Sequence, residues 1–539
     1  MKLIEKDGLY FKDLAGTGEL YPYEDWRLPA EQRASDLASR MSVEQIAGLM
    51  LYSRHQFIPG VSMPYFGEVT YNGKSIQESG LPVSQSQTSR RLSQRRLIRH
   101  LLIISVQSAA DAAKWNNNIQ SLAEELPWGI PVAISSDPRH GTTVTFEFDA
   151  GAGGDISHWP EPLGLAATFE PELMEKFGKI ASKEYRGLGI TTALSPQIDL
   201  CTEPRWKRFA GSIGESSKLG ADLARAYCDG FQTSEGDSEI TDGWGYESVN
   251  TMVKHWPGGG AVEGGRDAHF GSGKYSVYPG DNFEEHLLPF TEGAFKLHGK
   301  TGKASSVMPY YTAVYGKAGN YENAGSGYSK YLITDLLRNT YHYDEVVCTD
   351  WSITEDASTL ENLYGGKCWG AEKLTRGERC YRILMAGVDQ FGGLNEKEPV
   401  LDAYRIGVKE HGETFMRKRL EQSAVRLLKN IFRVGLFENP YLDPEVSART
   451  VGCAEYMEEG FAAQKKSIVM LKNKENVLPL QKKMKVYVPK IHWPESVDWM
   501  CRNGGALGQS NFPRTAGEVF HSDGSSRRGG CSNLYHSSA

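Results

Sequence analysis

The feature of this sequence that most constrains its fold is a regular alternation of apolar, strand-like segments with amphipathic, helix-like ones. Strands are predicted at 100–106, 130–137, 190–199, 249–256, 304–311, 346–348 and 390–393. Helices are predicted between them at 108–126, 171–188, 216–232, 283–298, 329–341 and 375–388, with further long helices to residue 437. Alternation repeated this often predicts an α/β fold in which a parallel sheet closes into a (β/α)₈ barrel of the TIM type.

The alternative architecture is an open, doubly wound parallel sheet. That fold normally carries a glycine-rich turn after its first strand to bind a dinucleotide, and no GxGxxG follows residues 100–106. The glycine-rich run at 151–154 is preceded by acidic residues, which makes it a poor cradle for phosphate. The sequence therefore favours the barrel.

Composition divides the chain into four predicted parts. Residues 1–437 form an amino-terminal catalytic barrel, opened by helices within 29–52 in which Ser42 and Gln45 have the spacing of a capping box. Residues 438–453, with Asn-Pro and Asp-Pro pairs, form a linker, and 454–499 begin a second α/β domain with a helix at 454–472 and a strand at 485–490. One strand cannot bury a face alone, so we expect this domain to be incomplete, and residues 500–539 to form a disordered tail.

The charge balance excludes several classes of partner. The net charge is -7 and acidic and basic residues are well mixed, which argues against a nucleic-acid or membrane surface. No stretch approaches the roughly 20 apolar residues of a membrane span. The first 20 residues lack a signal peptide, and the eight cysteines are scattered, so we expect a cytoplasmic protein with reduced thiols. A start site further upstream would make it periplasmic or secreted.

Polar side chains follow the predicted strands, at the points where the strands end. The carboxyl ends of parallel strands meet at one edge of a barrel, so we expect these side chains to lie together. They are Asp137, Arg205, Lys254, His255, Tyr310, Tyr311, Asp350 and Trp351. Asp350 alone could simply cap a turn. Five successive strands that all lead into charged or aromatic residues are much harder to obtain by chance.

Such a rim suits a ligand with many hydroxyl groups. Asp137 can accept two vicinal hydroxyls, while Lys254, His255 and Arg205 supply charge-assisted donors. Trp351 offers a face for the apolar side of a pyranose. Asp350 then lies where it could attack an anomeric carbon, with cations nearby to keep the carboxylate ionised.

At this point the sequence resembles a known family. The motifs TALSPQIDLCTEPRWKRFAGSIGE, KHWPGGG, VMPYY and VVCTDW resemble those of the family-3 glycoside hydrolases, chiefly bacterial β-glucosidases and β-xylosidases. The resemblance implies retaining, exo-acting cleavage of terminal β-linked glucosyl or xylosyl residues through a covalent glycosyl-enzyme. It implies Asp350 as nucleophile, and as sugar contacts Asp137, Arg205, Lys254, His255 and Tyr311, with Arg266 of the EGGRD segment as an extra contact. It implies an oligosaccharide or glycoside as partner and no metal or organic cofactor, and it leaves the oligomeric state open.

The acid/base residue is not assigned by the resemblance. In the two-domain members it is a glutamate of the second domain, whereas another branch, with β-N-acetylhexosaminidase activity, uses an Asp-x-His pair after Lys-His. Here Asp267 and His269 lie on that loop, two residues later than the usual spacing, and His269 could instead simply bond within a long loop. Tyr310 also replaces a residue that is usually small. A catalytically inactive sugar-binding protein therefore remains an alternative function, as does a purely structural remnant.

Overall fold

The structure is a computed structural model that describes residues 2–57, 97–105, 108–141, 156–316, 323–357 and 365–480, with two short strands at 70–71 and 74–75. The chain forms two compact units, Met1–Ile468 and Val469–Ala539. In the described part of the second unit, a short 3-10 helix, Lys474–Asn476, lies within a loop closed by hydrogen bonds between the Asn473 side chain and the backbone of Leu478.

A seven-stranded sheet forms the centre of the first unit, and its strands pair in the order β15-β13-β11-β8-β7-β6-β3. All of these pairings are parallel. The strands are β3 (Gln56–Phe57), β6 (His100–Ser105), β7 (Ala133–Ser136), β8 (Ile190–Ala193), β11 (Asn250–Trp256), β13 (Ser306–Pro309) and β15 (Val346–Val347). β7, β8, β11, β13 and β15 are buried along their whole length, as expected for strands covered on both faces.

Isolated β-bridges close the sheet into a barrel. Cys348, directly after β15, pairs with Gln390, and Phe391 pairs with Leu51 on the segment that leads into β3. Tyr52 of the same segment then pairs with His100 at the start of β6. The segment 390–391 therefore takes the eighth strand position, and the predicted (β/α)₈ barrel is confirmed.

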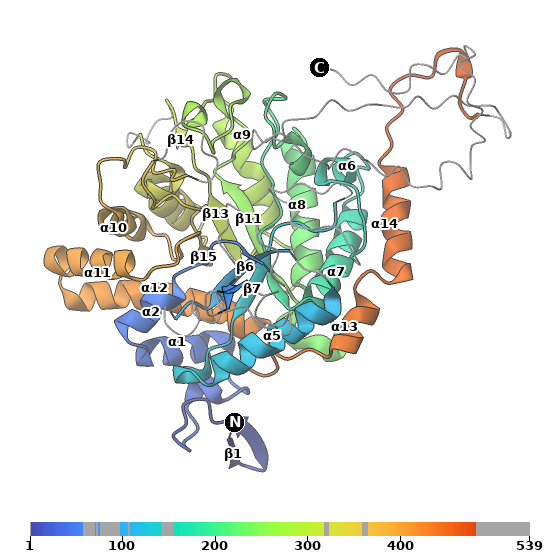
Figure 1. Ribbon diagram of the computed structural model, residues 1–539. Coiled ribbons are helices and arrows are strands. Elements are labelled where there is room, and N and C mark those ends of the chain that lie inside the picture. The colour runs from blue at the N-terminus through green and yellow to red at the C-terminus, as the bar shows by residue number, and fades with distance from the viewer. Residues whose placement is uncertain are drawn as a thin grey trace. The chain divides into compact units, whose positions relative to one another are not determined.

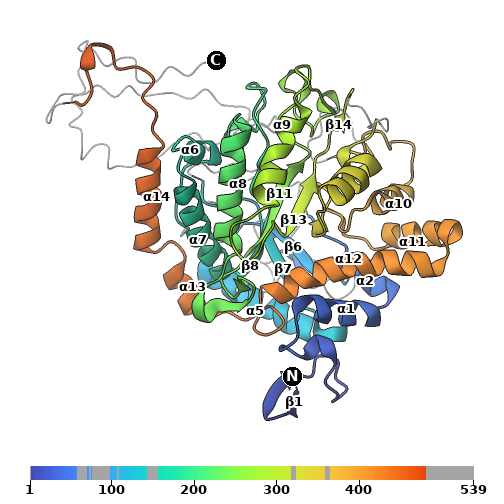
Figure 2. The same ribbon diagram turned by 180° about the vertical axis from the view of Figure 1, so that it is seen from behind.

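Helices surround the sheet on its outer side (Figures 1 and 2). Those that follow the successive strands are α5 (Ala109–Glu124), α7 (Pro171–Gly187), α8 (Ser217–Gln232), α9 (Phe283–Leu288) continued by the π-helix η7 (Pro289–Ala294), the π-helix η9 (Tyr331–Thr340), α10 (Arg376–Ala386), α11 (Glu398–His411) and α12 (Glu413–Arg433). Further α-helices among the described residues of this unit are α1 (Ala30–Arg40), α2 (Val43–Leu49), α6 (Pro162–Ala166), α13 (Pro444–Thr450) and α14 (Ala454–Lys466). Short strand pairs lie outside the barrel: β1 (Leu3–Lys6) with β2 (Leu9–Lys12), β4 (Thr70–Tyr71) with β5 (Lys74–Ser75), β9 (Glu239–Thr241) with β10 (Trp244–Gly245), and β12 (Tyr275–Ser276) with β14 (Ala313–Val314).

Side-chain caps fix where several helices begin. The capping box predicted for Ser42 and Gln45 is confirmed, because each side chain bonds the backbone N–H of the other. Thr375 and Glu378 form the same box at α10, and Ser108 caps α5. These caps satisfy N–H groups that the first helical turn leaves without partners.

The structure differs from the sequence-based expectations at three places. The segment predicted as an ordinary helix at 329–341 is wound as the π-helix η9. The predicted linker 438–453 contains α13, which packs on α5 and α7, and the first unit runs to Ile468 rather than to residue 437. Four parts of the sequence lie outside the described residues: the glycine-rich run at 151–154, the predicted strand at 485–490, the tail from residue 500 and most of 53–95. The expected division into domains therefore stays a prediction.

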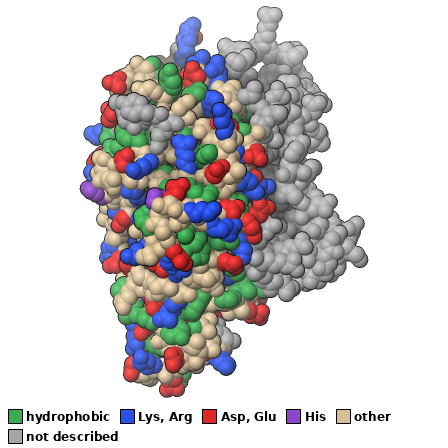
Figure 3. Space-filling model, turned by 90° about the vertical axis from the view of Figure 1, so that its left-hand side faces the viewer, with side chains coloured by type: hydrophobic (Ala, Val, Ile, Leu, Met, Phe, Trp, Pro, Cys, Tyr) green, Lys and Arg blue, Asp and Glu red, His purple; other side chains and the backbone are tan. Residues whose placement is uncertain are grey.

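The surface agrees with the mixed charge of the sequence. On the face shown in Figure 3, acidic and basic side chains are interspersed. Within the part of the chain that the structure describes, every helix is too short or too polar to cross a membrane.

A buried cluster ties the start of β15 to the helices behind it. Asp389, fully buried, accepts hydrogen bonds from the backbone N–H of Val347 at 3.1 Å and from Arg338 of η9 at 2.7 Å. Its other oxygen accepts from Ser423 and Arg426 of α12, at 2.8 and 2.9 Å. This carboxylate therefore fixes the strand that leads to Asp350.

Candidate active site

Asp350 lies beyond the carboxyl end of β15 and is only 7% exposed. Its Oδ1 accepts a hydrogen bond from the backbone N–H of Trp351 at 2.7 Å. Its Oδ2 has no hydrogen-bond partner among the described residues. One oxygen of the carboxylate is thus held in place while the other keeps its lone pairs available, an arrangement that suits a nucleophile.

His255 faces this free oxygen from the end of β11. Its Nε2 lies 3.8 Å from Asp350 Oδ2, and its Nδ1 lies 2.7 Å from Asp199 Oδ2. The side chains of His255 and Asp199 are almost completely buried. Burial, together with the positive charge of Arg208, holds the pKa of His255 well below its usual value, so the ring is uncharged at neutral pH.

Lys254 and Asp137 form an ion pair beside this group. Lys254 Nζ donates to Asp137 Oδ1 at 2.9 Å, and the two side chains are only 5% and 13% exposed. The Tyr185 hydroxyl of α7 donates to the backbone carbonyl of Asp137 at 2.8 Å and fixes the end of β7. The pair brings a cation and a carboxylate to the same rim, as the sequence predicted.

Tyr311 lies between Asp350 and the loop that follows β11. Its phenol is next to the Asp350 carboxylate, and its ring centroid is 4.9 Å from that of His269. Burial and the charge of Asp350 raise the pKa of Tyr311 well above its usual value, so the hydroxyl keeps its proton. Lys367 adds a cation 5.3 Å from the ring.

Asp267 and His269 form a close pair on this loop. Asp267 Oδ1 lies 2.5 Å from His269 Nδ1 and accepts from the His269 backbone N–H, while Oδ2 accepts from the Trp206 indole at 3.1 Å. Although burial pushes its pKa upward, His269 outweighs that effect and the pKa of Asp267 is lowered. Burial lowers the pKa of His269, against the opposing charge of Asp267. The pair presents an oriented imidazole beside Tyr311.

The two predicted arginines lie outside the buried group around Asp350. That group consists of Asp350, His255, Asp199, Lys254, Asp137, Tyr311, Asp267 and His269. The Arg205 side chain is 72% exposed and binds Glu203 through two hydrogen bonds of 2.7 and 2.8 Å. Arg266 is 56% exposed and lies 3.5 Å from Glu263. The arginine inside the group is Arg208, which is buried and contributes positive charge at His255, at Asp267 and at Tyr311.

Sequence reasoning missed Arg208 although it stands three residues after Arg205 in the same motif. An exposed and a buried arginine cannot be distinguished by residue type alone, because the turn between 203 and 212 decides which of them points inward. The carbonyl of Arg208 also accepts from the Gln197 side chain at 3.2 Å, which anchors that turn to the residues after β8.

Trp351 is half-buried at the edge of the group. Its indole N–H donates to the Ser53 carbonyl at 3.1 Å, and its ring centroid is 5.2 Å from that of Tyr52. A Cβ added to Gly392 or Gly393 would approach this ring to 2.8 Å, so glycine at both positions leaves room for it. The ring is thus held rigidly beside Asp350.

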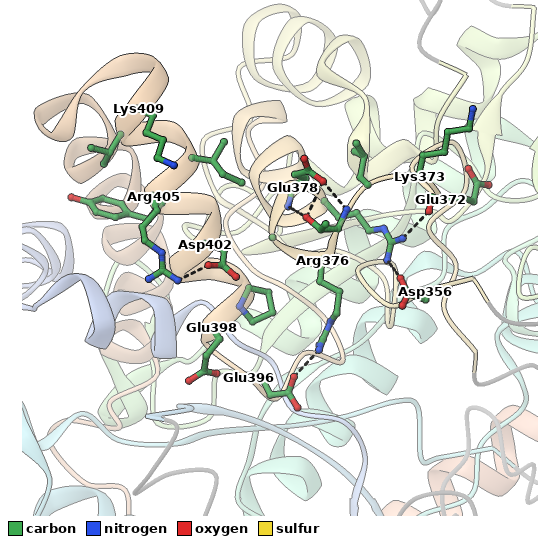
Figure 4. Close-up of a pocket in the computed structure, with 18 of the residues that line it drawn as sticks. Asp356, Glu372, Lys373, Arg376, Glu378, Glu396, Glu398, Asp402, Arg405 and Lys409 are labelled. Atoms are coloured by element: carbon green, nitrogen blue, oxygen red, sulfur yellow. Dashed lines mark hydrogen bonds and ion pairs between the residues drawn. The ribbon is translucent and has the colours of Figure 1, made fainter.

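A separate hollow of about 1240 Å³ lies between α10 and α11 (Figure 4). Many of its lining residues are charged, and three pairs of them bond to each other: Arg376 with Glu396, Arg379 with Asp356, and Arg405 with Asp402. No residue of the group around Asp350 lines it. Among the described residues, no cluster of three or more His, Cys, Asp and Glu side chains could hold a metal ion.

Comparison with known proteins identifies the family of this barrel. The model of the glycosyl hydrolase family 3 N terminal domain matches residues 76–429, well over half of the chain. The chain belongs to glycosyl hydrolase family 3. A periplasmic β-glucosidase/β-xylosidase of Dickeya chrysanthemi is 38% identical over 507 residues, which are 91% of this chain and 71% of that protein. A probable β-glucosidase C of Aspergillus flavus is 37% identical, over 85% of this chain and 67% of its own length.

Solved structures share the fold of this family-3 chain. A β-glucosidase from Erythrobacter marinus superposes with a TM-score of 0.65 at 21% identity, over 85% of this chain and 52% of that one. A β-glucosidase from Listeria innocua in complex with glucose gives 0.59 at 20% identity, over 84% and 54%. The chain therefore spans about half the length of these solved relatives. The predicted family is confirmed, and the relatives' names agree with the predicted class of enzyme, a glycosidase.

The placement of the two arginines in this family-3 site leads to a paired prediction. Arg208→Gln should lower kcat/KM for an aryl β-glucoside about tenfold or more, because a charge-assisted contact in a buried site is lost. Arg205→Gln should change it less than about twofold, because that side chain is exposed and paired on the surface. Steady-state kinetics on both variants, with thermal melts to confirm folding, measure the difference. A larger loss for Arg205→Gln would show that the turn at 203–212 is placed differently.

Proposed function

We propose that this chain cleaves terminal β-linked glucosyl or xylosyl residues with retention of configuration, with Asp350 as the nucleophile. The observation that carries the proposal is the free Oδ2 of Asp350, held by the bond from Trp351 N–H to Oδ1 and surrounded by the Lys254–Asp137 pair, His255 and Tyr311. The names of the relatives from Dickeya chrysanthemi and Aspergillus flavus support the substrate class.

In the first step, Asp350 Oδ2 attacks the anomeric carbon while the aglycone oxygen departs. This forms a covalent glycosyl-enzyme, which water hydrolyses in the second step. Asp137 accepts sugar hydroxyls, while Lys254 and Arg208 act as charged donors, and these contacts tighten as the ring flattens in the transition state. The Trp351 ring lies beside the sugar, and Tyr311 keeps its proton and steadies the nucleophile.

We further propose His269 as the group that moves protons. Asp267 bonds to Nδ1 and so orients the ring, with Nε2 on its far side. Because burial lowers its pKa, His269 is uncharged at neutral pH, which suits the removal of a proton from water in the second step. As the pH falls through the pKa of His269, the imidazole gains a proton. The charged ring can then give a proton to the leaving group in the first step, but it can no longer take one from water in the second.

The cytoplasmic location expected from the amino-terminal sequence stays a prediction. The named Dickeya chrysanthemi relative is periplasmic. In the described part of the chain six cysteines are free thiols. Cell fractionation in the source organism would decide between the compartments.

Covalent trapping tests the nucleophile. A 2-deoxy-2-fluoro-β-glucoside with a dinitrophenolate leaving group should add one sugar to the chain, and mass spectrometry after digestion should place it on Asp350. Asp350→Asn should abolish the adduct. Asp344→Asn is the matched control at the start of the same strand, where the side chain is 68% exposed, and should label normally. Labelling of another carboxylate, or inversion of the product's anomeric configuration, would refute the assignment.

Leaving-group dependence tests His269. At a pH below the pKa of His269, where the ring carries the proton that a departing sugar alkoxide needs, His269→Ala should lower turnover of cellobiose by about 10²–10⁴-fold. Formation of the glycosyl-enzyme from a dinitrophenyl glucoside should be much less affected, since that leaving group needs none. His298→Ala, which replaces an exposed histidine, is the control. An equal effect on both substrates, or none, would show that another group moves the proton, such as a glutamate outside the described residues.

A further inference from the structure

Asp199 is a fully buried carboxylate that the mechanism above does not use. It follows β8, and its carboxylate oxygens bond to His255 near the end of β11 and to Gly259 on the loop that leaves this strand. Its Oδ1 accepts from the backbone N–H groups of His255 and Gly259, at 2.9 and 2.5 Å. Its Oδ2 meets the Nδ1 of the His255 ring at 2.7 Å.

These contacts fix both the position and the proton of the His255 ring. Burial raises the pKa of Asp199, against two N–H donors and the charge of Arg208, which favour its charged form. A carboxylate only accepts hydrogen bonds, so the uncharged ring must carry its single proton on Nδ1. Nε2 then has a lone pair where it faces Asp350 Oδ2, and the separation of 3.8 Å is longer than a hydrogen bond.

We propose that Asp199 is a positioning residue that keeps the attacking oxygen of Asp350 free, by holding the His255 ring with its proton on the far nitrogen. With a proton on Nε2 instead, His255 would donate to Asp350 Oδ2 and occupy the lone pair needed for attack. The same lone pair on Nε2 can accept a hydroxyl of the bound sugar. This inference rests on the proposed role of Asp350 as nucleophile.

Several other titratable groups surround the Asp199–His255 pair and act on this proton. Arg208 faces both partners, and His286 from α9 and Tyr278 lie near Asp199. Lys254, Asp350 and His269 face the His255 ring, and Tyr310 covers it at a centroid distance of 4.7 Å. The charge of Asp350 favours a second proton on the ring, as does that of the Asp199 carboxylate, and burial and the cations oppose it.

A simpler role for Asp199 would be to hold the loop at Gly259. Asp229 does only that elsewhere in the barrel: it is buried near the end of α8 and accepts from the backbone N–H groups of His298 and Gly299, at 3.0 and 2.9 Å. α8 ends at the edge of the sheet opposite to the carboxyl ends of the strands. Asp229→Asn is therefore the matched control for loss of a buried, loop-holding carboxylate.

The decisive variant is Asp199→Asn in the full chain. The amide oxygen can still accept the two backbone N–H groups, but the amide nitrogen now donates to Nδ1 and moves the ring proton to Nε2. NMR of ring-¹⁵N-labelled histidine, with the His255 signals assigned from His255→Gln, should show protonated Nδ1 in the native chain and protonated Nε2 in the variant. The same tautomer in both would overturn the proposal. This readout does not depend on turnover, so it separates the proposal from the proposed function.

Kinetics then test the consequence for Asp350. Asp199→Asn should lower the rate of glycosyl-enzyme formation from a dinitrophenyl glucoside about tenfold or more, the scale of one charge-assisted hydrogen bond. The variant should have a lower kcat and not only a higher KM, because the attacking oxygen is occupied. Asp229→Asn should keep the rate within about twofold even if its melting temperature falls. Equal losses in the two variants would show that Asp199 only holds its loop.

Discussion

Closure of the parallel sheet is the constraint on which the rest of the structure depends. The bridges from Cys348 to Gln390 and from Phe391 to Leu51 complete the ring of strands. They bring the end of β15 close to the segment at Leu51 that leads into β3. That is why Trp351 can donate to the Ser53 carbonyl, some 300 residues earlier in the chain. Without closure, Asp350 would have no fixed neighbours on that side.

Within this frame, the charges at the rim stabilise one another in a low-dielectric interior. Lys254 is paired with Asp137, His255 with Asp199, and His269 with Asp267, so each partly or fully buried charge or ring has a partner on another strand end or on its own loop. Among the described residues, the Tyr310 hydroxyl lacks a hydrogen-bond partner, and so does Asp350 Oδ2. An unsatisfied buried oxygen is costly, and its position at the centre of the site makes it the natural place for a substrate.

Much of the barrel could be predicted from the sequence because buried parallel strands read as apolar runs and because amphipathic helices separate them. The strand ends were also predictable, since charged residues at the end of β11 and after β15 interrupt those runs. What the sequence could not supply was local geometry. Arg205 and Arg208 differ only in how one turn places them, and the π-helical winding of η9 and the packing of α13 depend on tertiary contacts rather than on propensity. Nothing in the sequence distinguished Asp199, as the partner of the His255 ring, from any other buried carboxylate.

The most direct test of the account is a crystal structure of the full chain with the 2-deoxy-2-fluoroglucosyl group trapped. The account predicts a bond between the anomeric carbon and Asp350 Oδ2, sugar hydroxyls on Asp137 and Lys254, and His255 Nε2 within hydrogen-bond distance of the sugar. A sugar bound to a different carboxylate, or lodged in the hollow between α10 and α11, would contradict it.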